Sequence, residues 1–263
     1  GRVDLGCFGN TRDSSGSPTI TIRSPHGEPY PPAGISDSAL GSLIEGIGMS
    51  NSIVTDGSTQ YMCLGWSALG PLPPSGTTTG IPPFTLGDNT EINWLWRTNY
   101  QVTVNSADDT QGSVAFSNGF YPAGTNLTVT AVASNGYSFS NWAGTLVTND
   151  NPFSFTVDQP YSLTANFSLN THTLNVSSPP FSTPFPDIGL STSFWGDVIN
   201  ASVISPVVLG DTQYVCLGWT GAGSVPASGT SNTVSFTLTN DSSIAWLWRT
   251  NYQVTVNSAD DTQ

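Results

Sequence analysis

An exact internal repeat constrains this sequence more than any other feature. Residues 94–111 return without a single change as residues 246–263, an offset of 246 − 94 = 152 residues. One full period therefore covers 112–263, and 1–111 hold most of another. Self-similarity of this kind indicates a tandem array in which each unit contacts its neighbours. We expect several small modules in an elongated particle, with the array cut in mid-repeat.

Composition favours an extracellular protein. Only 9% of the residues are charged, and the net charge is −13, with 18 acidic residues against 5 arginines and no lysine. This charge disfavours nucleic acid and anionic membrane surfaces as partners, because both attract cationic patches. The sequence has no run of about 18 apolar residues that would insert in a membrane. We predict a secreted or cell-surface protein.

Alternation of apolar and polar residues predicts strands. Such period-2 patterns are typical of antiparallel strands with one wet face and one core face. Turn signals such as Asn118-Gly119 and Asn135-Gly136 separate the runs. The clearest runs are 100–104, 127–131, 153–157 and 161–167.

One segment carries conflicting signals. Leu40, Leu43, Ile44 and Ile47 have helical spacing. The equivalent segment of the other copy, 196–205, is β-branched and typical of a strand. We therefore predict a strand in both places.

Residues 100–168 resemble a known family. The resemblance covers six pieces whose order and spacing are fairly specific: Gly112-Ser-Val-Ala-Phe, Tyr121-Pro-Ala-Gly-Thr, Leu127-Thr-Val-Thr-Ala, Gly136-Tyr-Ser-Phe-Ser-Asn-Trp-Ala-Gly144, Asn151-Pro152 and Leu163-Thr-Ala-Asn-Phe167. Together they are similar to the divergent internalin-type B-repeat of bacterial surface proteins. The one departure is Asn141, which stands where a glycine commonly precedes the tryptophan. The resemblance implies a small β module, and the flanking segments look like longer relatives of it.

These observations predict an all-β tandem array of small antiparallel sheet or sandwich modules, with a β-grasp-like variant as an alternative for single modules. Residues 1–18 are predicted to form an N-terminal arm, and Asp4-Leu-Gly-Cys-Phe-Gly-Asn-Thr11 resembles the last coil of bacterial parallel β-helix domains. The modules that we expect are 19–98, 99–169 and 170–250, with 251–263 as the first strand of a next repeat.

Nothing in the sequence composes a catalytic site, so we expect no enzyme and no cofactor. Neither His26 nor His172 lies in a nucleophile–base signature. The paired carboxylates Asp108-Asp109 and Asp260-Asp261 favour solvated turns. The alternative is that they bind Ca²⁺ together with oxygen atoms such as that of Asn105.

Three cysteines are present, Cys7, Cys63 and Cys216. The last two occupy equivalent repeat positions, Tyr-Met-Cys-Leu-Gly-Trp and Tyr-Val-Cys-Leu-Gly-Trp. We interpret them as small buried residues on strands. An intermolecular disulfide is the alternative.

Eight tryptophans raise the question of sugar-stacking platforms. The positions Trp66, Trp142 and Trp219 match the tryptophan–glycine position of the family, which predicts burial. Burial is also predicted for the alternating pairs Trp94/Trp96 and Trp246/Trp248. Trp195 has no aromatic counterpart, because Leu40 takes its place in the other copy. It is the best candidate for an exposed, glycan-binding ring, although a core or inter-module contact is favoured.

Residues 252–257 repeat the strand that opens the middle module, so they are predicted to form a strand with Tyr252, Val254 and Val256 on its apolar face. Such a strand would either continue into further repeats or dock onto a neighbouring subunit by strand addition. The expected partners are thus copies of the chain or neighbouring repeats.

We predict a structural repeat region of a bacterial surface protein that acts as a stalk, a spacer or a self-assembling fibre. The first alternative is a carbohydrate-binding or adhesive module that uses exposed aromatic rings. The second is an accessory region of a polysaccharide-degrading enzyme, which rests on the β-helix-like N-terminus.

Overall fold

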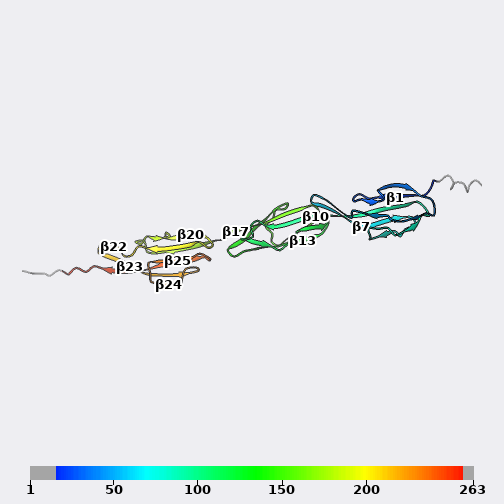
Figure 1. Cartoon of the computed structure of the whole chain (residues 1–263). Coiled ribbons are helices and arrows are strands. Elements are labelled where there is room, and N and C mark those ends of the chain that lie inside the picture. The colour runs from blue at the N-terminus through cyan, green and yellow to red at the C-terminus, as the bar shows by residue number, and fades with distance from the viewer. Residues whose placement is uncertain (1–15, 257–263) are drawn as a thin grey trace, which may run out of the picture. The chain divides into compact units, whose positions relative to one another are not determined.

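The computed structural model describes residues 16–256, which form strands and turns without a helix (Figure 1). No segment of this part of the chain is a helix able to cross a membrane. The contacts divide the chain into two compact units. One contains the described residues up to 105 with 114–130 and 142–164, and the other contains 106–113, 131–141 and the residues from 165 on. The all-β prediction is confirmed.

The first unit begins with a β-sandwich. Its main sheet contains β1 (Thr19–Arg23), β3 (Gly34–Asp37), β6 (Ile53–Asp56), β7 (Thr59–Leu69), β8 (Ser75–Gly76) and β10 (Thr90–Ser106). Two short pairs form the opposite layer: β2 (Pro29–Tyr30) with β5 (Gly48–Met49), and β4 (Leu43–Ile44) with β9 (Phe84–Thr85). The predicted strand around 43–44 is therefore confirmed. Helical spacing there is misleading, because only Ile44 and Ile47 contact the core, whereas Leu40 and Leu43 are exposed.

The core of this sandwich follows the alternation of apolar and polar residues along its strands. Ile20 and Ile22 of β1 lie on one face, and Ile92 and Trp94 of β10 lie on the same side of the sheet. They pack with Met49, Phe84 and other residues from the opposite layer. The core is thus formed between the two layers, as in a sandwich.

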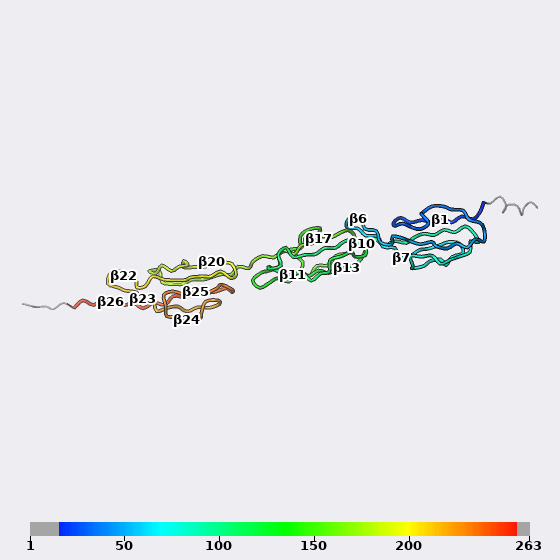
Figure 2. The backbone as a smooth tube through the Cα atoms, viewed as in Figure 1, coloured from blue at the N-terminus to red at the C-terminus, as the bar shows by residue number. Residues whose placement is uncertain are grey.

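The second unit ends in a sandwich of the same plan (Figure 2). One sheet has the order β20 (Gly189–Phe194), β18 (Thr171–Ser177), β26 (Ser242–Tyr252), β23 (Thr212–Ala222) and β22 (Val207–Leu209), with β24 (Ser228–Gly229) beside β23. The facing sheet has β19 (Pro184–Phe185), β21 (Val198–Val203) and β25 (Thr233–Thr237). Leu174, Trp219 and Trp246 from the first sheet pack with Ala201 and Phe236 from the second.

Each sandwich contains one parallel ladder, which alternation could not reveal. β1 pairs in parallel with β10, and β18 pairs in parallel with β26. Parallel neighbours need a long crossover, and here the crossover is made by the other strands of the same sandwich. The remaining ladders that we describe are antiparallel, as expected.

In the sequence, the strands of the B-repeat-like segment come between those of the two sandwiches, and they are distributed over both compact units. They are the end of β10, β11 (Gly112–Val114), β12 (Gly119–Pro122), β13 (Asn126–Val129), β14 (Ala131–Ala133), β15 (Tyr137–Gly144), β16 (Phe153–Thr156) and β17 (Tyr161–Leu169). The predicted alternating runs 100–104 and 161–167 are strands throughout, whereas Thr130 interrupts the run 127–131 and Val157 lies just after β16. Their inward positions are buried, for example Val102, Val129, Phe155 and Leu163.

A bulge recurs at the same place in both sandwiches. Leu64 is the extra residue where β7 meets β10, and Leu217 is its equivalent where β23 meets β26. The next residue, Gly65 or Gly218, has φ near +120°. A Cβ on Gly218 would lie 1.8 Å from the carbonyl oxygen of Gly229. Only glycine permits both this backbone conformation and this approach.

Candidate functional site

Burial removes most tryptophan rings from consideration as sugar platforms. Trp66, Trp142 and Trp219 are 2%, 0% and 7% exposed, as their family position predicted. Trp94 and Trp246 are buried as well. The faces of these rings are covered by core residues, so no sugar can stack on them.

The half-buried Trp96 belongs to an aromatic stack that the sequence analysis missed. The His26 and Tyr61 rings are stacked with their centroids 3.6 Å apart, and the Trp96 ring meets His26 edge-on at 5.7 Å. The Trp96 Nε1 donates to Ser24 Oγ at 3.0 Å. The loop after β1 is thereby held over the sheet.

The second sandwich repeats this stack with a different residue. Phe181 stacks on Tyr214 at 3.8 Å and meets Trp248 edge-on at 5.4 Å, while Trp248 Nε1 donates to Ser178 Oγ at 3.1 Å. The tyrosine, tryptophan and serine recur between copies and could have been found from the repeat. The His26-to-Phe181 exchange hid the stack, because the two residues differ in type.

Trp195 lies at a junction with the B-repeat segment. Its N–H donates to the Asn170 carbonyl, and the Asn170 N–H donates to the Gly136 carbonyl, both at 2.8 Å. Gly136 has φ +84°, and a Cβ on it would lie 2.3 Å from the Trp195 ring. The Trp195 ring therefore rests directly on the backbone of this turn.

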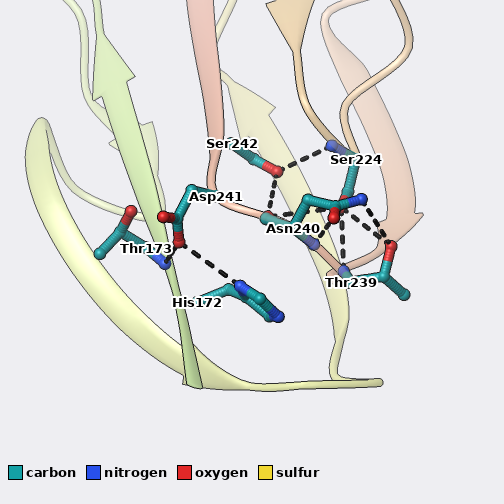
Figure 3. Close-up of polar contacts among 7 residues, drawn as sticks. All are labelled: His172, Thr173, Ser224, Thr239, Asn240, Asp241 and Ser242. Carbon is teal, nitrogen blue, oxygen red and sulfur yellow. Dashed lines mark hydrogen bonds and ion pairs between the residues drawn. The ribbon is translucent and has the colours of Figure 1, made fainter. Parts of the chain in front are cut away.

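A polar cluster at the start of β18 fixes the parallel ladder of the second sandwich (Figure 3). The Thr173 N–H donates to Asp241 Oδ1 at 2.8 Å, and His172 Nδ1 lies 3.5 Å from the same oxygen. The hydrogen bond from the Thr173 backbone is the main cause that lowers the pKa of Asp241 below its usual value of 3.8, and His172 adds to it.

Ser224 holds the loop that precedes β26 in the same cluster (Figure 3). Its N–H donates to Ser242 Oγ at 2.8 Å, and its Oγ accepts the N–H groups of Thr239 and Asn240 at 2.9 and 3.0 Å. The backbone N–H groups of Thr239 and Asn240 are thus satisfied by a side chain and do not need solvent. The cluster is a structural joint between strands.

The first sandwich makes the same joint with a neutral residue. The Thr19 N–H donates to Asn89 Oδ1 at 2.9 Å. Asn89 precedes Asp241 by 152 positions, so the two residues are exact equivalents in the repeat. An amide and a carboxylate accept the same hydrogen bond, which indicates that the geometry of the joint does not require the charge.

The candidate calcium ligand Asp108 serves as a turn cap. Its Oδ1 accepts the Thr110 N–H at 2.9 Å and the Thr110 hydroxyl at 2.7 Å, and its Oδ2 accepts Gln111 Nε2 at 3.1 Å. These hydrogen bonds, led by that from the Thr110 hydroxyl, lower the pKa of Asp108. Asp109 is exposed beside it. Asp260 and Asp261 lie outside the described residues.

The cysteine thiols of the described residues also have a structural position. Cys63 and Cys216 are free and half-buried at the two equivalent bulges, with Sγ 3.7 and 3.6 Å from the carbonyl oxygens of Gly65 and Gly218. Burial raises the pKa of the Cys216 thiol. Cys7 lies outside the described residues. Among residues 16–256, no three side chains of His, Cys, Asp or Glu gather as metal ligands would.

The predicted strand 252–257 is wrong over most of its length. β26 ends at Tyr252, and 253–256 form no strand, although the Gln253 N–H donates to the Asp211 carbonyl at 2.9 Å. Tyr252, Val254 and Val256 are 75%, 80% and 87% exposed. The repeat equivalents of 253–256 are residues 101–104, of which Gln101 and Val102 pair with β12, whereas no strand pairs with 253–256 among the described residues. Alternation alone therefore did not make a strand.

A comparison with protein families accounts for the middle of the chain. Residues 100–171 match the divergent InlB B-repeat domain. This segment is the B-repeat that the sequence motifs predicted, and it begins within β10 and ends after β17. No curated protein and no solved structure matches the chain.

Proposed function

We propose that this chain is a structural repeat region of a bacterial surface protein that acts as a spacer or stalk and assembles with copies of itself. The observation that carries the proposal is the path of β10. Its first part pairs with β7 of the sandwich, and its later part pairs with β12 of the B-repeat. Tyr100 belongs to both ladders, because Thr59 pairs with it on β7 and Tyr121 on β12.

A strand shared in this way supports a spacer role. Neighbouring modules joined by a flexible linker could pivot freely, whereas hydrogen bonds to both modules restrict the shared strand. Asn99 reinforces the shared part, because it is 2% exposed, donates to Gln60 Oε1 at 3.2 Å and accepts from Arg97 Nε at 3.0 Å. The contact of the Trp195 ring with Gly136 also limits the motion of the B-repeat turn against the sandwich that follows it.

Small-angle scattering tests the spacer role. A compact globule of this length has a radius of gyration of about 18 Å, and we expect a clearly larger value for dilute, monomeric protein. Inserting Gly-Ser-Gly-Ser after Thr98 interrupts the shared strand and should convert the profile to that of freely jointed modules. The same insertion after Gly87, whose surroundings are open, is the matched control and should leave the profile unchanged. A radius near the compact value, or identical profiles for both insertions, contradicts the proposal.

A further inference from the structure

We propose that residues 253–256 of one copy add as a strand to the open edge of β20 in a second copy. This inference rests on the proposed function, since it names the contact through which the chain would assemble. Val254 and Val256 are exposed, yet the identical Val102 and Val104 are 0% and 3% exposed in the B-repeat. The sequence of this tail therefore forms a buried strand where it has neighbouring strands, as β10 does in the B-repeat.

The acceptor edge is defined by hydrogen-bond pairing. β20 is the last strand of its sheet among the described residues, with β18 on its only paired side. The Trp195 N–H donates to the Asn170 carbonyl at the end of this ladder. Because hydrogen-bonded pairs alternate in an antiparallel ladder, Leu190 and Thr192 direct their backbone N–H and C=O groups away from β18. These four groups face the open side.

Features that normally protect an edge strand are missing from β20. Natural sheets protect open edges with charged side chains, proline or very short strands. Gly189–Phe194 is six residues long and contains neither a charged residue nor proline. Leu190 is 72% exposed at the same place, so an added strand would also cover apolar surface.

The equivalent edge of the first sandwich is protected. β3 has four residues and ends in Asp37. In register, Asp37 pairs with Thr19 of β1 as Thr192 pairs with Thr173 of β18. The chain thus contains a natural control: in the first sandwich, the position equivalent to Thr192 is occupied by the charged residue Asp37.

The tail and the edge are complementary. Residues 252–256, Tyr-Gln-Val-Thr-Val, are uncharged, and so is β20. Main-chain hydrogen bonds would supply affinity, and the valines would cover Leu190. Because the donor and the acceptor are different surfaces, each added copy offers a new tail or edge, and the contact propagates.

Sedimentation of the full chain from micromolar to millimolar concentration tests this contact. We expect the mass of the wild-type protein to rise with concentration. Deletion of 253–263, or the point change Val254→Pro that removes an N–H donor, should weaken association roughly tenfold or more. Thr192→Asp, which copies the charge of β3, should have the same effect. Thr220→Asp, on the paired strand β23, is the charge-matched control and should associate as the wild type does.

Mixing two deficient proteins gives the decisive result. The 253–263 deletion retains the acceptor and Thr192→Asp retains the donor, so together they should form a 1:1 dimer that grows no further. Asp37→Thr should open a second acceptor edge and increase the mass at equal concentration.

Three results would overturn the inference: a wild-type protein that stays monomeric, association that survives Thr192→Asp, or association that survives the deletion. The last would indicate that β20 pairs with itself. None of them affects the scattering test of the spacer role, which uses monomeric protein.

Discussion

Residues 98–104 and 250–256 have the same sequence and different structures. In the first segment the chain continues as β10, with Val102 and Val104 buried. In the second, β26 ends at Tyr252, and Val254 and Val256 are almost fully exposed. The preceding residues behave alike in both copies, since Trp94 and Trp246 are 3% and 4% exposed.

The two copies have the same structure as far as their pairing strands come from their own sandwich, and they differ beyond that point. Trp94 pairs with Trp66 and Trp246 pairs with Trp219, so both sandwiches complete this part of the strand from their own sequence. Val102 pairs with Gly119, a residue that follows it in the chain by 17 positions. Among the described residues, no strand equivalent to β12 pairs with 253–256. Strand formation is here a property of the pair and not of the segment.

The largest effect should be shared by both copies. Trp94→Ala and Trp246→Ala each remove a large buried ring and should each cost about 3–5 kcal/mol of the unfolding free energy of their own sandwich. Denaturant unfolding, monitored by NMR signals assigned to each sandwich, checks this expectation. If the losses of unfolding free energy for the two variants differ by more than roughly a factor of two, the two sandwiches do not hold this part of the strand equivalently.

A B-repeat sequence placed after residue 263 should abolish the structural difference between residues 101–104 and 253–256. Fusing a second copy of residues 112–171 after Gln263 restores the sequence that follows β10. The amide hydrogens of Val254 and Thr255 should then gain at least about 100-fold protection from exchange, because they enter a cooperative ladder. A Gly-Ser extension of equal length is the control and should give no protection. If both extensions behave alike, an intact B-repeat sequence is not sufficient to form this strand.

Substitution of valine by alanine should have different effects on stability at Val102 and at Val254. Val102→Ala removes two buried methyl groups and should destabilise the B-repeat by about 2 kcal/mol. Val254→Ala removes exposed atoms and should stay within about 0.5 kcal/mol of the wild type at concentrations where the protein is monomeric. Thermal or denaturant unfolding of each variant measures the contrast. A loss at Val254 equal to that at Val102 would show that the tail is buried in solution.

The smallest effect concerns the joints at Asn89 and Asp241. The pKa of Asp241 is lowered in the folded state below its usual value of 3.8, so its contribution to stability is present above this value and is lost as pH falls through the lower folded pKa. We expect the protection of the Thr173 amide to fall below about pH 4, whereas that of the Thr19 amide, which is bonded to the neutral Asn89, should not. Hydrogen exchange across this range measures both amides in one sample.

Asp241→Asn copies the first sandwich into the second and should remove this pH dependence while keeping the hydrogen bond. If Thr173 remains sensitive to acid in the variant, a group other than Asp241 is responsible.

The sequence by itself determined the class of fold, the repeat and the B-repeat segment. Alternation identifies inward residues such as Val129 and Leu163 because side chains of a strand point to opposite faces whatever the partner is. The repeat also identified the β-strand near Leu43, where helical spacing was misleading. The buried tryptophans follow from the same periodicity and from the motifs of the family.

Only the tertiary structure decided which strands are neighbours. It alone revealed the parallel ladders, the Trp195 ring on Gly136, the exchange of His26 for Phe181 in the aromatic stack, and the absence of strand in 253–256. The physical reason is that backbone hydrogen bonds of a strand are made to another segment, so the same residues are buried beside one edge and exposed without it.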